Sequence, residues 1–173
     1  MIALRPRALT GLLALPLLAG CGDTDAGAAD PTRLADAGYA SLGSSDFEGA
    51  LDDFERALGA LEPGAPGFVR AAMGKVEALI HLDAGRARDE FLALAAGYPD
   101  AVGTREFKTV GGKLTSEKRF EEAISVLHAG LEAYAEDPGL QAMLDRVAEE
   151  SERAGDAGAL DALRGLGYLG SKP

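Results

Sequence analysis

The chain is poor in cysteine, aromatic residues and positive charge. Cys21 is its one cysteine, tryptophan is absent, and only six phenylalanines and four tyrosines occur among 173 residues. One thiol cannot close an internal disulfide, so packing alone has to hold the domain together. With so few rings, the core must be built largely from alanine and leucine, which favours close-packed helices.

The shortage of positive charge limits the partners. The chain has 17 basic and 28 acidic residues, and its net charge is −11. Its first 20 residues contain two arginines and no acid, so the remainder carries −13. Such a domain is repelled by nucleic acid and by an anionic membrane surface. We therefore expect no nucleic-acid partner, and residence at a membrane would need a covalent or inserted anchor.

The longest apolar stretch is too short for a permanent membrane span. It runs over 13 residues from Ala8 to Gly20, is interrupted by Thr10 and Pro16, and follows two arginines. A spanning helix needs roughly 20 apolar residues. A charged start followed by a short apolar region is instead typical of an export signal.

The export signal ends in Leu18-Ala19-Gly20-Cys21, which resembles the lipobox of bacterial lipoproteins at all four positions. The resemblance implies a signal peptide over residues 1–20, cleavage before Cys21, and acylation of its thiol. Two acyl chains suffice for stable anchoring. The alternative is a generic secretory signal followed by an ordinary core cysteine.

Residues 21–30 are small and acidic without periodicity, which predicts a flexible tether reaching at most about 30 Å. In lipoproteins of bacteria with two membranes, aspartate directly after the acylated cysteine favours retention in the inner membrane. Gly22 occupies that place here. By this resemblance we expect a lipid-anchored protein of the cell envelope, on the periplasmic face of the outer membrane.

Beyond residue 30, three similar segments recur at 45–50, 84–87 and 118–123, and their alanines are 37 and 36 residues apart. Each opens a run of apolar residues at helical spacing, and each is preceded by another helical stretch, at 32–42, 67–82 and 104–114. A proline follows each run, where its ring cannot continue a helix. We expect the third run to be nearly a turn longer and to reach Pro138.

These segments resemble the tetratricopeptide repeat, a helix-turn-helix of about 34 residues. Small residues lie where its two helices cross, and the matching positions here include Gly38, Ala50, Ala57 and Gly111. The large position is matched by Phe54, and the first helix of the third copy also matches at Phe107, Val110 and Leu114. Three features depart from the repeat. Ser41 replaces the usual aromatic residue of the first helix in the first copy, and Gly130 replaces the second alanine in the third copy. The first helix of the second copy fits only with a one-residue slip.

The resemblance implies an all-α fold, a right-handed solenoid of antiparallel helix pairs. Its repeats would cover about 31–66, 67–103 and 104–139, within a domain over 31–173. Residues 140–170 would form capping helices over the last repeat, with the first of them at 140–154. The alternative is an irregular bundle of amphipathic helices.

Catalytic chemistry is not visible in the sequence. A hydrolase needs a nucleophile with a base, a metal site needs clustered ligands, and nucleotide binding needs a glycine-rich phosphate loop. His81 and His128 are 47 residues apart and lack ligand-like neighbours. We expect no catalytic residue, metal, cofactor or small-molecule substrate; the alternative is an enzyme with an unrecognised site.

The repeat resemblance implies a groove lined by the first helix of each pair, in which a peptide or protein segment binds. The groove-facing positions are Tyr39, Arg105, Lys108, Gly112, Arg146 and Glu149. Arg105, Lys108 and Lys113 suggest an acidic or carboxylate-ended segment, unless these cations only balance local acids such as Glu106 and Glu117.

We therefore expect a membrane-anchored interaction scaffold of the bacterial envelope. A different class of function is a non-catalytic accessory or regulatory subunit of an envelope enzyme or polysaccharide system. It is suggested by the segment 163–168, which resembles a tail of some bacterial sulfatase-like proteins.

Overall fold

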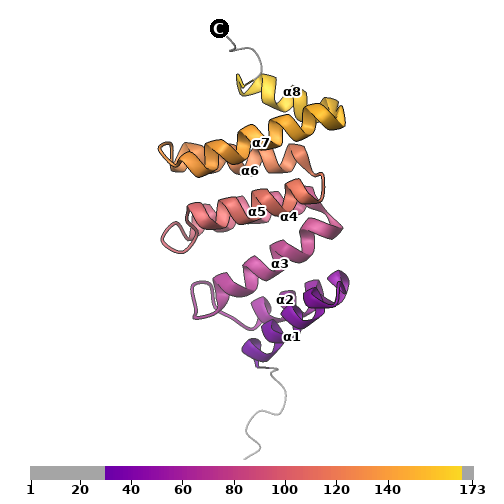
Figure 1. Cartoon of the computed structure of the whole chain (residues 1–173). Helices are drawn as coiled ribbons and strands as arrows, with labels where there is room; N and C mark the ends of the chain where they lie inside the picture. The colour runs from indigo at the N-terminus through magenta and orange to yellow at the C-terminus, as the bar shows by residue number, and fades with distance from the viewer. Residues whose placement is uncertain (1–29, 169–173) are drawn as a thin grey trace, which may run out of the picture.

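The computed structural model describes residues 30–168, and within that range the chain forms eight α-helices and no strand (Figure 1). The expected all-α class is thus confirmed. The helices are α1 (Pro31–Gly43), α2 (Phe47–Gly59), α3 (Phe68–Leu82), α4 (Ala84–Gly97), α5 (Thr104–Ser116), α6 (Phe120–Ala133), α7 (Pro138–Ala154) and α8 (Ala157–Gly165).

Most of these helices begin at an aspartate. The side chains of Asp30, Asp46, Asp83, Asp137 and Asp156 each accept a hydrogen bond from a backbone N–H in the first turn that follows. The first N–H groups of a helix have no partner inside it, so such a cap stabilises the start by about 1 kcal/mol. These aspartates therefore set where five of the eight helices begin.

The turns after α1, α5 and α7 have the same construction. Each contains one residue in the left-handed conformation: Ser45 (φ 62°), Lys118 (φ 57°) or Gly155 (φ 69°). The next residue donates its N–H to the carbonyl five positions back, over 2.9, 2.8 and 3.1 Å. This closure satisfies a carbonyl at the helix end. The pair α3 and α4 differs, because Asp83 both ends α3 and caps α4.

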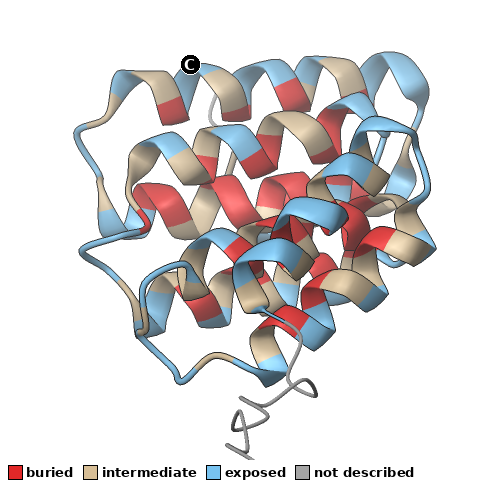
Figure 2. Cartoon of the chain, turned by 90° about the horizontal axis from the view of Figure 1, so that it is seen from below, coloured by how far each residue is buried: buried red, intermediate tan, exposed pale blue. Residues whose placement is uncertain are grey.

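The helices stack in chain order from α1 to α8 (Figure 1). Each helix packs on the next within α1 to α4 and within α5 to α8, and α4 joins the second group through α6. In addition, α1 contacts α3, α3 contacts α5, and α5 contacts α7. These odd-numbered helices form one layer, with α2, α4 and α6 behind them, and α8 packs on α6 and α7 at the end of the stack. Buried residues lie where helices meet, and exposed residues lie outside (Figure 2).

The core has two parts. The larger runs from α3 to α8, and the smaller joins α1, α2 and α3 around Phe54. In the smaller part, Phe54 is the one large fully buried side chain, and alanines make up the rest of its buried set.

Glycines let the Phe54 ring lie directly on the backbones of two helices. A Cβ on Gly38 of α1 would be 2.9 Å from this ring, and one on Gly74 of α3 would be closer still. Gly111 plays the same part against Leu127, at 2.7 Å. The close approach expected at Gly38 and Gly111 is therefore present.

The end of α6 corrects one expectation. This helix ends at Ala133, not near Pro138, and at 14 residues it has the same length as α4. Tyr134 closes it by donating its N–H to the Gly130 carbonyl over 2.8 Å. Pro138 is instead the first residue of α7, where the missing N–H costs nothing and the fixed φ suits a helix. Accordingly α7 begins at Pro138, two residues before the expected start at residue 140.

Candidate functional site

Two hollows of the odd-numbered layer form where first helices of successive pairs meet. The larger, which we call the Tyr39 groove, has a volume of about 540 Å³ and crosses α1, α3 and α5. The smaller, the Arg146 pocket, has a volume of about 260 Å³ and lies between α5 and α7. The Tyr39 groove is lined by Tyr39, Val69, Arg70, Met73, Ala101, Arg105, Glu106 and Thr109.

Tyr39 and Arg70 hold each other in place at one end of the groove. The Tyr39 hydroxyl donates to the Arg70 carbonyl over 2.7 Å, and the Arg70 guanidinium lies 4.6 Å from the centre of the Tyr39 ring. Arg70 also donates to Asp36 over 2.9 Å. Burial raises the pKa of Tyr39, although the Arg70 charge opposes the rise. The Tyr39 side chain is therefore neutral, is fixed in orientation, and lines the groove beside the Arg70 cation.

Arg105 is the most accessible cation of the groove, with 89% of its side chain exposed. Its Nε donates to Glu106 over 2.8 Å, and the other Glu106 oxygen accepts the Gly103 N–H at the start of α5 over 2.9 Å. Because a guanidinium has five N–H donors, most of those on Arg105 remain for another acceptor. Arg105 thus offers charge-assisted hydrogen bonds to a carboxylate that enters the groove.

Glu106 links the groove to the stability of α5. Burial disfavours its charge, but the hydrogen bonds from Arg105 and from the Gly103 N–H outweigh burial and lower the pKa of Glu106. Since the folded pKa is depressed, the carboxylate stabilises the fold above the ordinary glutamate range. That contribution is lost as the pH falls through the folded pKa.

Replacing Glu106 by glutamine should therefore lower the free energy of unfolding at neutral pH by about 1 kcal/mol, because an amide keeps an acceptor for Gly103 but loses the charge. Urea unfolding measured from neutral to strongly acidic pH tests this. The difference between wild type and Glu106→Gln should shrink as the pH falls below the ordinary glutamate range. A difference that stays constant with pH would contradict the assignment.

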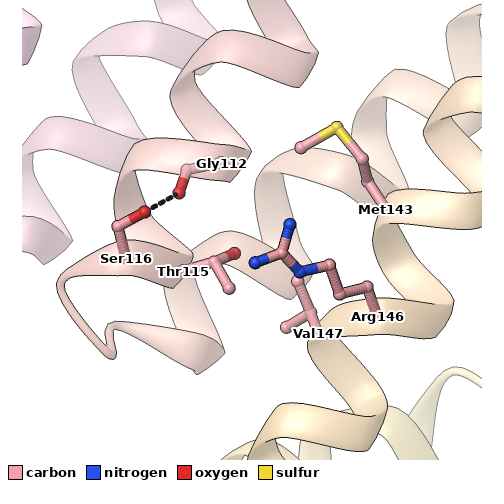
Figure 3. A pocket seen from close by; sticks show the side chains of 6 residues that line it. All are labelled: Gly112, Thr115, Ser116, Met143, Arg146 and Val147. Atoms are coloured by element: carbon pink, nitrogen blue, oxygen red, sulfur yellow. Dashed lines mark hydrogen bonds between the residues drawn. The ribbon is translucent and has the colours of Figure 1, made fainter.

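The Arg146 pocket is lined by Gly112, Thr115 and Ser116 of α5 and by Met143, Arg146 and Val147 of α7 (Figure 3). Its space depends on Gly112, where a Cβ would come within 3.3 Å of the Met143 methyl group. The Arg146 guanidinium reaches toward α5 across the pocket while its Nε donates to Glu150 over 2.7 Å (Figure 3). The pocket is thus partly apolar with one cation at its mouth.

The hydroxyls of the Arg146 pocket are already engaged. Thr115 donates to the Gly111 carbonyl over 2.7 Å, and Ser116 donates to the Gly112 carbonyl over 3.0 Å. They can still accept hydrogen bonds, but they are not activated as nucleophiles by any neighbouring base. The pocket therefore offers two hydroxyl acceptors beside its apolar side chains.

Four of the six positions expected to face a groove are brought together in these hollows: Tyr39 and Arg105 in the groove, Gly112 and Arg146 in the pocket. The other two line neither. Lys108 is tied to Asp137, the cap of α7, over 3.2 Å, and Glu149 is 75% exposed beside Arg153 at 4.0 Å. Lys113 pairs with Glu77 of α3.

The contribution of α3 to the groove was not predicted from the sequence. The first helix of the second pair fits the repeat pattern only with a one-residue slip, and this slip hides which of its residues face the groove. The two glycines that precede α3 and α5, Gly67 and Gly103, are 36 residues apart. Aligned on them, Val69, Arg70 and Met73 correspond to Arg105, Glu106 and Thr109, and all six line the groove.

The two histidines lie apart from both hollows. His81 stacks on Phe47 at 3.8 Å between ring centres, and His128 lies edge-on to Tyr168 at 6.4 Å. Over residues 30–168, no group of three side chains is arranged to hold a metal ion, and none of the helices is long and apolar enough to cross a membrane. Cys21 and the expected signal peptide lie outside the described residues.

Comparison with known proteins gives no match: neither a family model, nor a curated protein, nor a solved structure is significantly similar to the chain.

Proposed function

We propose that this chain is a lipid-anchored interaction scaffold of the bacterial cell envelope. In this proposal Cys21 carries the anchor, and the helix pairs form a solenoid of the tetratricopeptide type. A peptide or protein segment binds along the layer made by α1, α3, α5 and α7. The protein itself performs no catalysis.

The observation that carries the binding proposal is that positions expected from the repeat to face a groove also line hollows of the structure. Four positions that the repeat resemblance predicts to face a groove line hollows of one layer: Tyr39, Arg105, Gly112 and Arg146. Each hollow combines half-buried apolar side chains with an arginine at its edge. This combination suits an extended segment that inserts apolar side chains and presents a carboxylate.

Two features support the solenoid proposal. The spacing of 37 and 36 residues between Ala50, Ala87 and Ala123 is close to that of the repeat. The shared turn after α1, α5 and α7 repeats the same hydrogen bond and the same left-handed residue. The pair α3 and α4 departs from this construction, so we propose an irregular second repeat.

The binding proposal is tested by photo-crosslinking in cells of the source bacterium. A photoreactive residue placed at Arg105 should yield a discrete crosslinked product, because this position lines the groove and its side chain is 89% exposed. The matched control is the same residue placed at Arg56 of α2, which is 54% exposed outside the odd-numbered layer. The control should yield none.

A second variant checks that the product depends on the groove. Met73→Glu puts a charge on the half-buried lining of the groove, which should prevent insertion of an apolar side chain. In the protein labelled at Arg105, this change should abolish the crosslink. Equal products at Arg105 and Arg56, or a product that survives Met73→Glu, would refute binding in the Tyr39 groove.

A further inference from the structure

A third hollow opens between α4 and α6, on the even-numbered layer. Its volume is about 310 Å³. Nine residues line it, and all are apolar or aromatic: Leu92, Ala95, Ala96, Pro99, Val102, Phe107, Ala129, Ala133 and Tyr134. We call it the α4–α6 hollow.

The hollow exists because the facing positions of the two helices are alanines. Ala95 and Ala96 of α4 and Ala129 and Ala133 of α6 are too small to fill the space between the helices. The Phe107 ring lies beneath, packed against Phe91 and Tyr134 at 5.0 and 6.1 Å between ring centres.

The one polar side-chain group of the lining is already used. The Tyr134 hydroxyl donates to the Val102 carbonyl over 3.2 Å. The hollow therefore offers shape and apolar surface, and its lining has no vacant side-chain hydrogen-bond donor. Its natural occupant is an apolar side chain.

The charge around the hollow is negative at the end where α4 and α6 finish. Both helices end beside the lining residues, at Gly97 and Ala133, and neither has a basic residue in its last turn. The carboxyl end of a helix carries a partial negative charge that usually attracts lysine or arginine. The dipoles of α4 and α6 are thus not neutralised by their own side chains.

Acidic residues strengthen this field. Asp100 follows α4, and Glu136 follows α6. Glu132 lies in the last turn of α6, with 70% of its side chain exposed and one oxygen 3.6 Å from Nε2 of His128. The nearest cation on α4 is Arg88, one turn before Leu92, and it is paired with Asp89 at 2.7 Å. This end of the hollow therefore favours a cation from outside.

We propose that the α4–α6 hollow is a second docking surface, which takes an amphipathic segment of a partner with apolar side chains flanked by lysine or arginine. The apolar side chain fills the hollow, and the cations meet Asp100, Glu132, Glu136 and the two helix ends. A second copy of this chain does not suit the surface, because residues 21–173 carry a net charge of −13 and two copies would repel each other. The site is separate from the Tyr39 groove, and neither proposal depends on the other.

The test uses a fluorescein-labelled peptide of leucine and lysine whose sequence forms an amphipathic helix. Its control is a scrambled isomer of identical composition without an apolar face. Fluorescence anisotropy with the lipid-free protein should show the amphipathic peptide bound about tenfold more tightly than the isomer, because only it can bury leucine in the hollow. The binding should weaken as salt is added.

Two variants locate the binding. Ala96→Arg and Ala133→Arg each place a bulky cation on the wall of the hollow, at exposed helical positions that tolerate arginine. Each should remove the preference for the amphipathic peptide. Circular dichroism should show unchanged helical content, which separates a loss of binding from a loss of the fold.

A charge-matched pair of variants tests the acidic rim. Glu132→Gln with Glu136→Gln should weaken binding of the amphipathic peptide severalfold, whereas Glu48→Gln with Asp52→Asn on α2 should change it far less. The proposal is overturned if wild type binds both peptides equally, or if Ala96→Arg and Ala133→Arg bind as wild type does. Self-association that Ala96→Arg disrupts would also overturn it, in favour of a second copy.

Discussion

Replacing Gly74 by alanine is expected to destabilise the protein by about 2–3 kcal/mol, although alanine is the better helix former. The added Cβ would overlap the Phe54 ring. This ring is fully buried, and a Cβ on Gly38 would also be 2.9 Å from it, so the ring has little room to move. The mid-transition temperature of thermal unfolding, measured by circular dichroism, should fall clearly.

The matched control is Gly59→Ala at the end of α2. No atom lies within 4 Å of a Cβ built there, and the backbone is not left-handed. This substitution should be neutral or stabilise the fold by up to about 1 kcal/mol. A similar loss in both variants would show that Gly74 has no special packing role.

Combining Gly74→Ala with Phe54→Leu isolates the contact between the two residues. Leucine is smaller than phenylalanine and leaves space for the new methyl group. The double variant should therefore be less destabilised than the sum of the two single variants, with a coupling of about 1 kcal/mol or more. Additive effects would mean that the ring and the Gly74 backbone are not in rigid contact.

Replacing Cys21 by alanine should move the protein from the membrane fraction to the soluble fraction or leave it as an uncleaved precursor. A lipidated cysteine supplies the anchor in the proposed function, and two acyl chains account for stable attachment. Metabolic labelling with palmitate should mark the wild-type protein and not Cys21→Ala. A variant that is still labelled would contradict acylation at this residue.

The neighbouring residue provides a control for localisation. Gly22→Asp keeps the thiol but places an aspartate directly after it, as in lipoproteins retained in the inner membrane. This variant should still be labelled with palmitate but should fractionate with the inner membrane. Unchanged fractionation would show that the residue after Cys21 does not direct sorting in this protein.

The helices could be predicted from the sequence because their ends are encoded locally. Aspartates such as Asp46 and Asp137 supply the first acceptor of a helix, and a proline such as Pro99 prevents continuation. The end of α6 was missed because a proline such as Pro138 can mark either the end of one helix or the first residue of the next. It stops the preceding helix and also begins the next, and only the cap at Asp137 distinguishes the two.

The candidate site was less predictable, because it depends on how successive helix pairs are registered. Tyr39 and Arg105 belong to pairs whose pattern is clear. The α3 residues Val69, Arg70 and Met73 belong to the pair without a standard turn, where Asp83 serves two helices. Similarly, the pairing of Lys108 with Asp137 joins residues 29 positions apart, which no local pattern encodes.

The alanine-rich core around Phe54 links the local opening of the first helix pair to binding in the Tyr39 groove of the proposed function. In a stack of helices each unit is stabilised by its neighbours, and a terminal unit with little large apolar surface opens most readily. The pair α1 and α2 is such a unit, and it contributes Tyr39 to a groove that is otherwise built on α3 and α5. In the proposed function, a segment that spans this groove would bind only the stack in which α1 is in place. By mass action, the bound segment would raise the free energy needed to open the pair α1 and α2. These two helices would therefore become more ordered as the Tyr39 groove fills.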